Sequence, residues 1–119
     1  MNITYFYVAL GGAIGAALRY QFSLLVVFPV GTLLVNVIGS FAIGISWHLL
    51  MSKGAAAWGP FVMTGVLGGF TTFSTFSLDT LRLVEAGRVF QASGYVLATV
   101  VLAIVGCYAG ILIARGLGS

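Results

Sequence analysis

Charged residues are scarce in this sequence: only 6% of its 119 residues are Asp, Glu, Lys or Arg, whereas 61% are hydrophobic. A soluble domain averages about one quarter charged residues. A chain this short also leaves much of its surface exposed, so its core is too small to hide so much apolar material. The composition therefore excludes a soluble globular domain and predicts that lipid is the solvent.

Cysteine, histidine and carboxylates are scarcer still. Cys107 and His48 are single, and Asp79 and Glu85 are the only carboxylates. One His and one Cys make no metal cluster. No Ser-His-Asp arrangement, carboxylate pair or phosphate-binding loop is present, and a proton-coupled cation pump needs acidic groups within the membrane. We therefore expect no enzyme, and without a block of charge we expect no nucleic-acid partner.

Four mostly apolar segments lie at residues 5–28, 30–51, 58–83 and 90–114. A helix needs about 20 such residues to span a bilayer. The pattern predicts an all-α integral membrane protein whose four transmembrane helices form one domain over residues 1–119. Nothing of domain size is left over for a soluble module.

Glycine recurs at a spacing of four in three of these segments. The pairs are Gly11/Gly15, Gly65/Gly69 and Gly106/Gly110. This spacing lets helix backbones approach closely in lipid. The pairs fit packing within one four-helix bundle, but we favour packing between subunits, because so short a chain has little room for a pathway of its own.

The basic residues are divided almost evenly between the two ends of the predicted bundle. Lys53 and Arg115 fall on one side, and Arg82 and Arg88 on the other, with Arg19 near the second side. An excess of Lys and Arg on one side normally sets the orientation of a membrane protein. The near tie predicts insertion in both orientations and antiparallel pairing; the alternative is a single orientation fixed by other factors.

Polar side chains within a membrane segment point to function, because they are expensive there. Thr32, Asn36 and Ser40 are four residues apart and share one face of the second segment. They fit either a polar track for an ion or hydrogen-bonding contacts between helices. Arg19, late in the first segment, fits either a side chain that reaches the interface or an anion-attracting vestibule.

The stretch "GGFTTFSTF", residues 68–76, combines two glycines, four hydroxyls and three phenylalanines inside an apolar segment. We predict that Gly68 and Gly69 interrupt the helix, because a broken helix is tolerated where its backbone lines a cavity. Carbonyls freed by such a break commonly bind cations.

Three phenylalanines beside this break, Phe70, Phe73 and Phe76, recur at every third residue, so we predict one aromatic row. The edge of a phenyl ring is positive, and hydroxyls are donors that can rotate. Interleaved as they are here, they suit an anion path, whereas phenylalanines alone would indicate core packing.

In the fourth segment, Tyr95 and Thr99 are four apart on one face. They fit a continuation of the polar track. The alternatives are a tyrosine at the lipid interface and a threonine bonded to its own helix.

Three motifs, "GGAIGAALRY", "GTLLVNVIGSFAIG" and "GVLGGFTTFSTFSLDT", together resemble the Fluc (CrcB) family of fluoride channels. The resemblance covers all four segments in order. It implies a dual-topology antiparallel homodimer with two narrow pores in the bacterial inner membrane, which lets fluoride leave the cytoplasm down its gradient. Its partners would be fluoride, lipid and a second copy of the chain.

The resemblance also implies roles for individual residues. Those matching the family's pore are Phe73, Phe76, Asn36, Ser74, Thr75, Tyr95 and Thr99, and Arg19 matches its vestibule arginine. The break from Gly68 to Thr71 resembles the place where main-chain carbonyls of two subunits hold a structural sodium ion. Ala103, one turn beyond Thr99, stands where some members carry another hydroxyl.

Two rival functions differ in what they require. A small multidrug transporter is also short and four-helical, but it should carry a glutamate in its first helix, and this chain has none there. A membrane scaffold without transport activity would explain the glycine spacing but not the hydroxyl-rich break.

Overall fold

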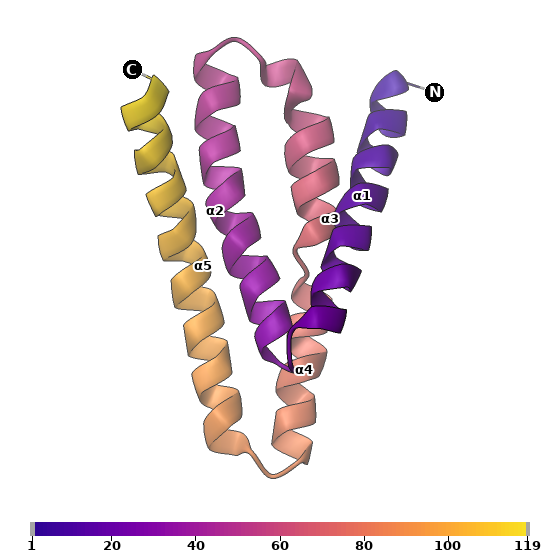
Figure 1. The fold of residues 1–119 in the computed structure, drawn as a ribbon, viewed down its shortest axis with the longest axis vertical. Helices are drawn as coiled ribbons and strands as arrows, with labels where there is room; N and C mark the ends of the chain where they lie inside the picture. Colours follow the sequence, from indigo (N-terminus) through magenta and orange to yellow (C-terminus); the bar gives the residue numbers. More distant parts are fainter. Residues whose placement is uncertain (1, 119) are drawn as a thin grey trace.

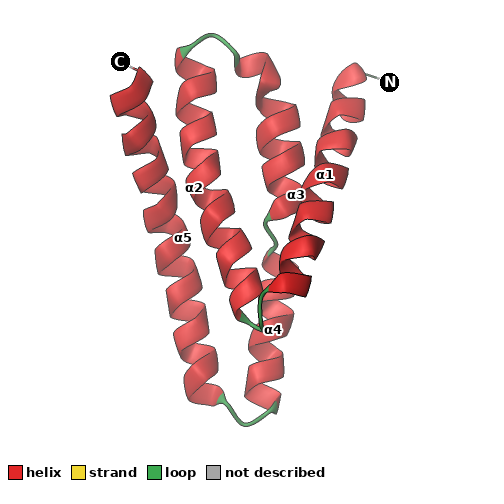
Figure 2. Cartoon of the chain, in the orientation of Figure 1, coloured by secondary structure: helices red, strands yellow, loops and turns green. Residues whose placement is uncertain are grey.

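The structure, a computed structural model, describes residues 2–118 as helices joined by short loops. In order, the elements are α1 (Ile3–Leu25), α2 (Val30–Ser52), the 3-10 helix η1 (Ala56–Trp58), the π-helix η2 (Pro60–Leu67), α3 (Gly68–Phe70), α4 (Phe73–Glu85) and α5 (Val89–Gly118). No strand occurs within this described range (Figure 2).

Four helical stretches are long and apolar enough to cross a membrane. They are Ile3–Leu25, Val30–Ser52, Ala56–Glu85 and Val89–Leu117. The chain therefore has the architecture of a multi-pass membrane protein, as the composition predicts. Its longest dimension, 50 Å, also exceeds the roughly 40–45 Å thickness of a bilayer with its headgroups.

The helix ends differ slightly from the predicted boundaries. α1 ends at Leu25 rather than at residue 28, because Val26 is extended (φ −119°, ψ 135°) and Phe28 precedes Pro29. A residue before proline avoids the helical conformation. At its start, α1 is capped by the side chain of Asn2, which accepts a hydrogen bond of 2.9 Å from the Thr4 amide.

The helices pack as two pairs. α1 lies against η2 and α3, while α2 lies along α5, and the lower helix α4 contacts α5 (Figure 1). The two ends of the described chain lie at the same end of the bundle, as an even number of crossings requires (Figure 1). The loop between α2 and η1 shares that end, and the turns before α2 and before α5 lie at the other.

Glycine makes both helix pairs possible. A Cβ on Gly11 would lie 2.6 Å from the Phe61 carbonyl oxygen, and one on Gly69 would lie 2.6 Å from that of Gly12. Between α2 and α5, a Cβ on Gly110 would meet the Phe41 carbonyl. Four of the six spaced glycines thus hold α1 against η2 and α3, namely Gly11, Gly15, Gly65 and Gly69. The preference for packing between subunits is wrong for these glycines, because their backbones already meet within one chain.

The helix interruption lies two residues beyond the predicted one. Gly68 is helical (φ −63°, ψ −37°), whereas Thr71 (φ −88°, ψ 160°) and Thr72 (φ −154°, ψ 124°) are extended and separate α3 from α4. The predicted interruption, at Gly68–Gly69 followed by threonines, is thus shifted to the threonines: Gly68 and Gly69 stay helical, and Gly69 packs closely on Gly12 instead.

Few side chains are buried, and most large apolar ones face outward. The main buried cluster joins α4 to α5 through Phe76, Leu83, Ala92 and Tyr95. By contrast, Phe90 is 94% exposed. Such outward apolar surface is stable only against lipid or another protein, which agrees with the membrane assignment.

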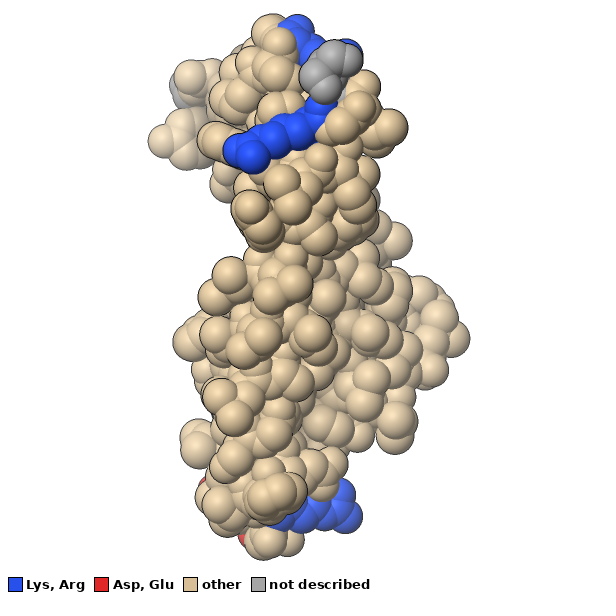
Figure 3. Space-filling view, turned by 90° about the vertical axis from the view of Figure 1, so that its left-hand side faces the viewer, with Lys and Arg blue, Asp and Glu red and all other residues tan. Residues whose placement is uncertain are grey.

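Charge is confined to the two ends of the molecule on the face seen in Figure 3, with an uncharged band between them. Arg115 lies in the last turn of α5 and Arg82 in the last turn of α4, at opposite ends of the bundle. The fold thus keeps nearly equal numbers of basic residues at the two ends, as expected from the sequence.

The close contact at Gly69 predicts a sharp difference between two glycine substitutions. Gly69→Ala should destabilise the protein by about 2 kcal/mol, because its new methyl group overlaps backbone atoms that cannot move aside. Gly94→Ala is the matched control, because a Cβ there meets nothing within 4 Å and alanine favours the helix. Thermal melting in detergent, followed by circular dichroism, measures both; equal melting temperatures for the two variants would contradict the packing described.

Candidate functional site: a helix break between two cavities

The two extended residues of the break are stabilised partly by their own side chains. The Thr71 hydroxyl donates to the Leu67 carbonyl (3.0 Å), which also accepts from the Thr71 amide (3.0 Å). The Thr72 hydroxyl accepts from the Thr75 amide (3.1 Å) and so caps the start of α4. Threonine is therefore suited to both positions: one closes α3 and the other opens α4.

Two side chains from other helices complete the hydrogen bonding of the break. Asn36 in α2 accepts from the Thr72 amide (2.8 Å) and donates to the Thr72 carbonyl (3.0 Å). Arg19 in α1 donates through Nε to the Gly69 carbonyl (3.0 Å). Asn36 therefore forms the interhelical contact that was one of its two predicted roles. Its amide keeps one further N–H and one lone pair for another partner.

A cavity of about 400 Å³ lies beside the break, between α2, α3, α4 and α5. Among residues 2–118, no charged residue lines it; its lining includes Asn36, Ser40, Thr71, Thr72, Phe73, Phe76, Thr99 and Ala103. The Thr99 hydroxyl is buried and has no hydrogen-bond partner among the described residues. An unpaired buried hydroxyl is costly, so this one is available to a water molecule or an ion.

The three phenylalanines do not form one row. Phe70 is 7% exposed and packs edge-on against Phe22 in α1 (centroids 5.6 Å apart), away from the other two. Phe73 and Phe76 remain neighbours, with ring centroids 5.6 Å apart, and Phe76 also packs on Tyr95 (5.3 Å). The prediction of a single row is wrong because extended Thr71 and Thr72 interrupt the helical spacing after Phe70.

Phe73 and Phe76 differ in exposure although both line the 400 Å³ cavity. Phe76 is 7% exposed, whereas Phe73 is 78% exposed on the outer surface of the chain. Ser74 is also exposed, with its hydroxyl 3.3 Å from that of Thr72. Thr75 lines a different cavity, of about 200 Å³, together with Arg19, Thr32 and Thr72. Thr72 is thus common to the two cavities, and sequence reasoning missed its importance.

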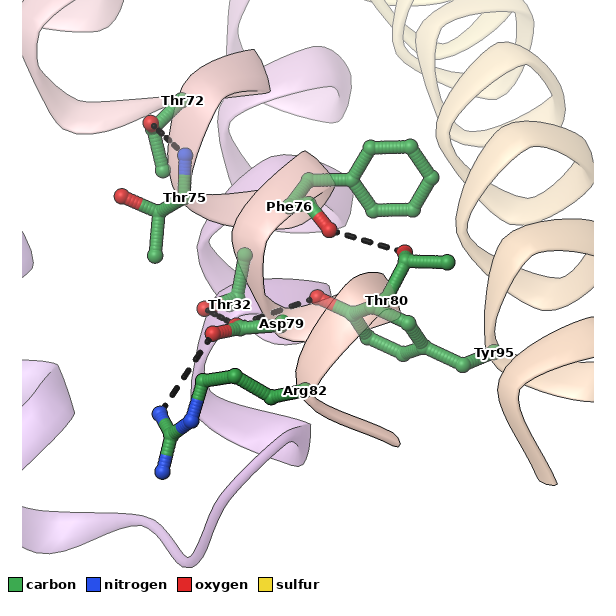
Figure 4. Close-up of polar contacts among 8 residues, drawn as sticks. All are labelled: Thr32, Thr72, Thr75, Phe76, Asp79, Thr80, Arg82 and Tyr95. Atoms are coloured by element: carbon green, nitrogen blue, oxygen red, sulfur yellow. Dashed lines mark hydrogen bonds and ion pairs between the residues drawn. The ribbon is translucent and has the colours of Figure 1, made fainter. Parts of the chain in front are cut away.

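A buried carboxylate, Asp79, organises the polar contacts below the break (Figure 4). It is 3% exposed; its Oδ2 accepts from the Thr32 hydroxyl (2.7 Å) and the Tyr95 hydroxyl (3.4 Å). Arg82 Nη1 lies 3.9 Å from Oδ1. Sequence reasoning missed this burial. The signal for burial is the spacing of Phe76, Asp79 and Leu83, which places the carboxylate on the buried face of α4.

The predicted face of the fourth segment is buried. Tyr95, at 6% exposure, points its hydroxyl to Asp79 and so is not an interfacial residue of the described chain. Thr99, at 5%, makes no bond to its own helix.

No group of three or more His, Cys, Asp or Glu side chains within residues 2–118 is arranged to hold a metal ion. A cation at the break would therefore rest on other oxygens, such as main-chain carbonyls. The last carbonyls of a helix lack partners within it, and Gly68 lies in α3 just before the break. Thr71 lies outside both helices. These two carbonyls therefore fit a small hard cation by chemistry, while the Gly69 carbonyl is occupied by Arg19.

Comparison with known proteins identifies the family. The CrcB family, described as "CrcB-like protein, Camphor Resistance (CrcB)", matches residues 6–111. The chain belongs to the CrcB family. It is 48% identical to the "Fluoride-specific ion channel FluC" of Paracoccus denitrificans, over 98% of each chain. It is 45% identical to "Fluoride-specific ion channel FluC 2" of Nitrobacter hamburgensis, over 97% of this chain and 99% of the relative. The predicted family resemblance is thereby confirmed.

The paired contact of Asn36 with Thr72 predicts a loss of stability in Asn36→Ala. The substitution leaves the backbone amide and carbonyl of Thr72 without their partner within the membrane. Each unpaired buried group costs about 1–3 kcal/mol of stability. The melting temperature in detergent should therefore fall by several degrees. Ser40→Ala is the control, because Ser40 lines the same cavity one turn away without a hydrogen bond among the described contacts. Unchanged melting of Asn36→Ala would show that water replaces the amide at no cost.

Proposed function

We propose that this CrcB-family protein is a fluoride channel of the bacterial inner membrane, through which fluoride leaves the cytoplasm down its electrochemical gradient. The observation that carries the proposal is the 400 Å³ cavity at the break, lined by hydroxyls, an amide and two phenyl rings but by no charged side chain. Hydroxyl and amide donors suit an anion, and the positive edges of phenyl rings suit it as well. Several weak contacts in series let an ion enter and also leave, as conduction requires.

The choice of fluoride rests on the relatives. Donors of this kind favour any small anion, and the cavity chemistry alone does not separate fluoride from chloride. Curated relatives that are 43–48% identical over nearly the whole chain carry the name fluoride-specific ion channel. In this proposal the pore is lined by Phe73, Phe76, Asn36, Ser74, Thr75, Tyr95 and Thr99, and Arg19 lies at its vestibule.

A second copy of the chain would complete the pore. Phe73 lies at the start of α4 beside the break, yet it is 78% exposed, and its neighbour Ser74 is exposed as well. A hydroxyl at the edge of a polar cavity is poorly suited to lipid, and the exposed Phe73 ring lies at the same edge. An antiparallel partner would cover both, and the near tie of basic residues at the two ends supports insertion in both orientations. The stretch Ala56–Glu85 would then cross as one broken helix at the dimer interface.

A structural sodium ion on the dimer axis forms part of the proposal. The Gly68 and Thr71 carbonyls of one chain supply two oxygens, so an ion bound there would need two more from the partner. The ion would fix the backbone of both breaks relative to each other. It would carry no step of conduction. The competing account is that water and neighbouring helices satisfy these carbonyls.

The function is tested by reconstituting the purified protein in liposomes and following efflux with fluoride- and chloride-selective electrodes. Wild-type protein should release fluoride and retain chloride. Phe73→Ile should slow fluoride at least about tenfold, a barrier increase of about 1.4 kcal/mol, because an aliphatic side chain has no positive edge. Since Phe73 is exposed within its own chain, this substitution should leave the fold intact.

Phe90→Ile serves as the matched control, because Phe90 is 94% exposed at the start of α5 and does not line the cavity. It should conduct like the wild type. Wild-type vesicles that retain fluoride would refute the proposed function. If the wild type releases fluoride and Phe73→Ile releases it at the same rate, only the role of the Phe73 ring is refuted, and the proposed function stands.

The sodium site predicts that the dimer depends on small cations. Replacing all sodium by a bulky organic cation, such as N-methylglucamine, should lower both the melting temperature of the dimer and its fluoride efflux, because carbonyls of the two breaks would then repel one another. Size-exclusion chromatography with light scattering measures the dimer fraction in each salt. An unchanged dimer fraction and melting temperature would rule the site out.

A further inference from the structure

A second polar cleft lies on the other side of the break from the 400 Å³ cavity. It consists of two cavities, of about 200 and 230 Å³, between α1, α2 and α4. They adjoin because both are lined by Ser23, Gly31, Thr32 and Thr75. We call their union the α1–α4 cleft. Thr72 lines it at the break and is shared with the 400 Å³ cavity.

The α1–α4 cleft has an arginine in each of its two cavities. Arg19 lines the one next to the break and Arg82 the one near the end of α4. Two arginines and one carboxylate, Asp79, thus line the cleft. The net positive charge of the cleft raises the local concentration of anions.

Arg82 is held at its position without losing its charge. Its guanidinium carbon lies 4.2 Å from the centroid of the Phe28 ring, an arrangement that attracts the cation without using its hydrogen-bond donors. Its contact with Asp79 is long, at 3.9 Å, and its side chain is 58% exposed. Five N–H donors on a fixed planar group therefore remain largely available to another anion.

The carboxylate of Asp79 is stabilised mainly by neutral donors. Thr32 and Tyr95 both donate to one of its oxygens (Figure 4). Next to it, the hydroxyl of Thr75 makes no hydrogen bond to any residue drawn in Figure 4. The cleft therefore offers, from its outer end inward, a charged donor at Arg82, a free hydroxyl at Thr75 and a second charged donor at Arg19.

We propose that Arg82 is the outer anion-collecting residue of the channel, which draws a hydrated, halide-sized anion into the α1–α4 cleft on its way to the break. Phe28 is its positioning residue. The proposal rests on the function proposed above and extends it, because it assigns the approach route and the group that begins it. Removal of the Arg82 charge should slow capture of the anion and leave the later, drier part of the path unchanged.

The test measures fluoride efflux from liposomes at limiting fluoride for Arg82→Gln, Arg82→Lys and Arg88→Gln. An impermeant organic salt sets the ionic strength to about 0.01 M or about 1 M, where charge acts over about 30 Å or about 3 Å. Arg88 is the matched control: it lies at the same end of the bundle, also exposed, but lines neither cavity of the cleft.

At low ionic strength, Arg82→Gln should reduce efflux about threefold or more, and at high ionic strength the difference should largely vanish. Arg82→Lys should retain most of the wild-type rate, and Arg88→Gln should change it little. Phe28→Leu, which keeps the charge but removes the ring, should give a smaller loss with the same dependence on salt.

A purely structural role of Arg82 would instead lower efflux equally at both ionic strengths, and that result would overturn the proposal. So would equal effects of Arg82→Gln and Arg88→Gln, or an unchanged rate in Arg82→Gln. If Arg82→Gln does not yield a folded dimer, the salt dependence of Phe28→Leu decides. If the wild-type protein passes no fluoride, the proposed function fails together with this proposal. If the wild type conducts and only the variants contradict the expectation, the proposed function stands, so the two failures are distinguishable.

Discussion

A polypeptide in lipid must satisfy its backbone hydrogen bonds from within, because the bilayer core offers no water to replace them. The extended pair Thr71 and Thr72 violates this rule locally, and most of the remaining architecture compensates for it. Asn36 supplies the two hydrogen bonds that a helix would have supplied to Thr72. Arg19 occupies the Gly69 carbonyl on the other side. The break is therefore a defined structure, stabilised from α2 and α1 at once.

The same contacts require the helices to be very close. Arg19 reaches Gly69 because α1 lies close against η2 and α3, with glycines at the closest backbone contacts. On the other side, a Cβ on Gly39 would meet the side chain of Thr71, so glycine in α2 makes room for the extended residue. Backbone proximity and polar bonding thus depend on each other. A larger residue at either crossing would separate the very groups that satisfy the break.

Between these supports lie two polar cavities of different character. The 400 Å³ cavity is uncharged, whereas the α1–α4 cleft carries two arginines and one carboxylate. A charged cleft suits long-range electrostatic attraction, which acts on an ion that still keeps its water. Short-range contacts belong in the uncharged cavity, where fixed charge would bind the ion too tightly to release it. Thr72 lines both, which makes the break the boundary between capture and passage.

Sequence alone determined the features that depend on local composition. Four apolar runs of sufficient length predict four membrane-spanning helices, and the hydroxyl-rich stretch after Gly69 predicts an interruption nearby, because both follow from residues adjacent in the chain. Only the tertiary structure decided where the interruption falls. Gly68 and Gly69 have the conformational freedom to break a helix, but Asn36, 36 residues from Thr72, pairs with the backbone further on. Likewise, burial of Asp79 depends on Thr32 and Tyr95 from two other helices. Partners so distant in sequence leave no periodic trace in the segment they stabilise, so their effect appears only once the helices are packed.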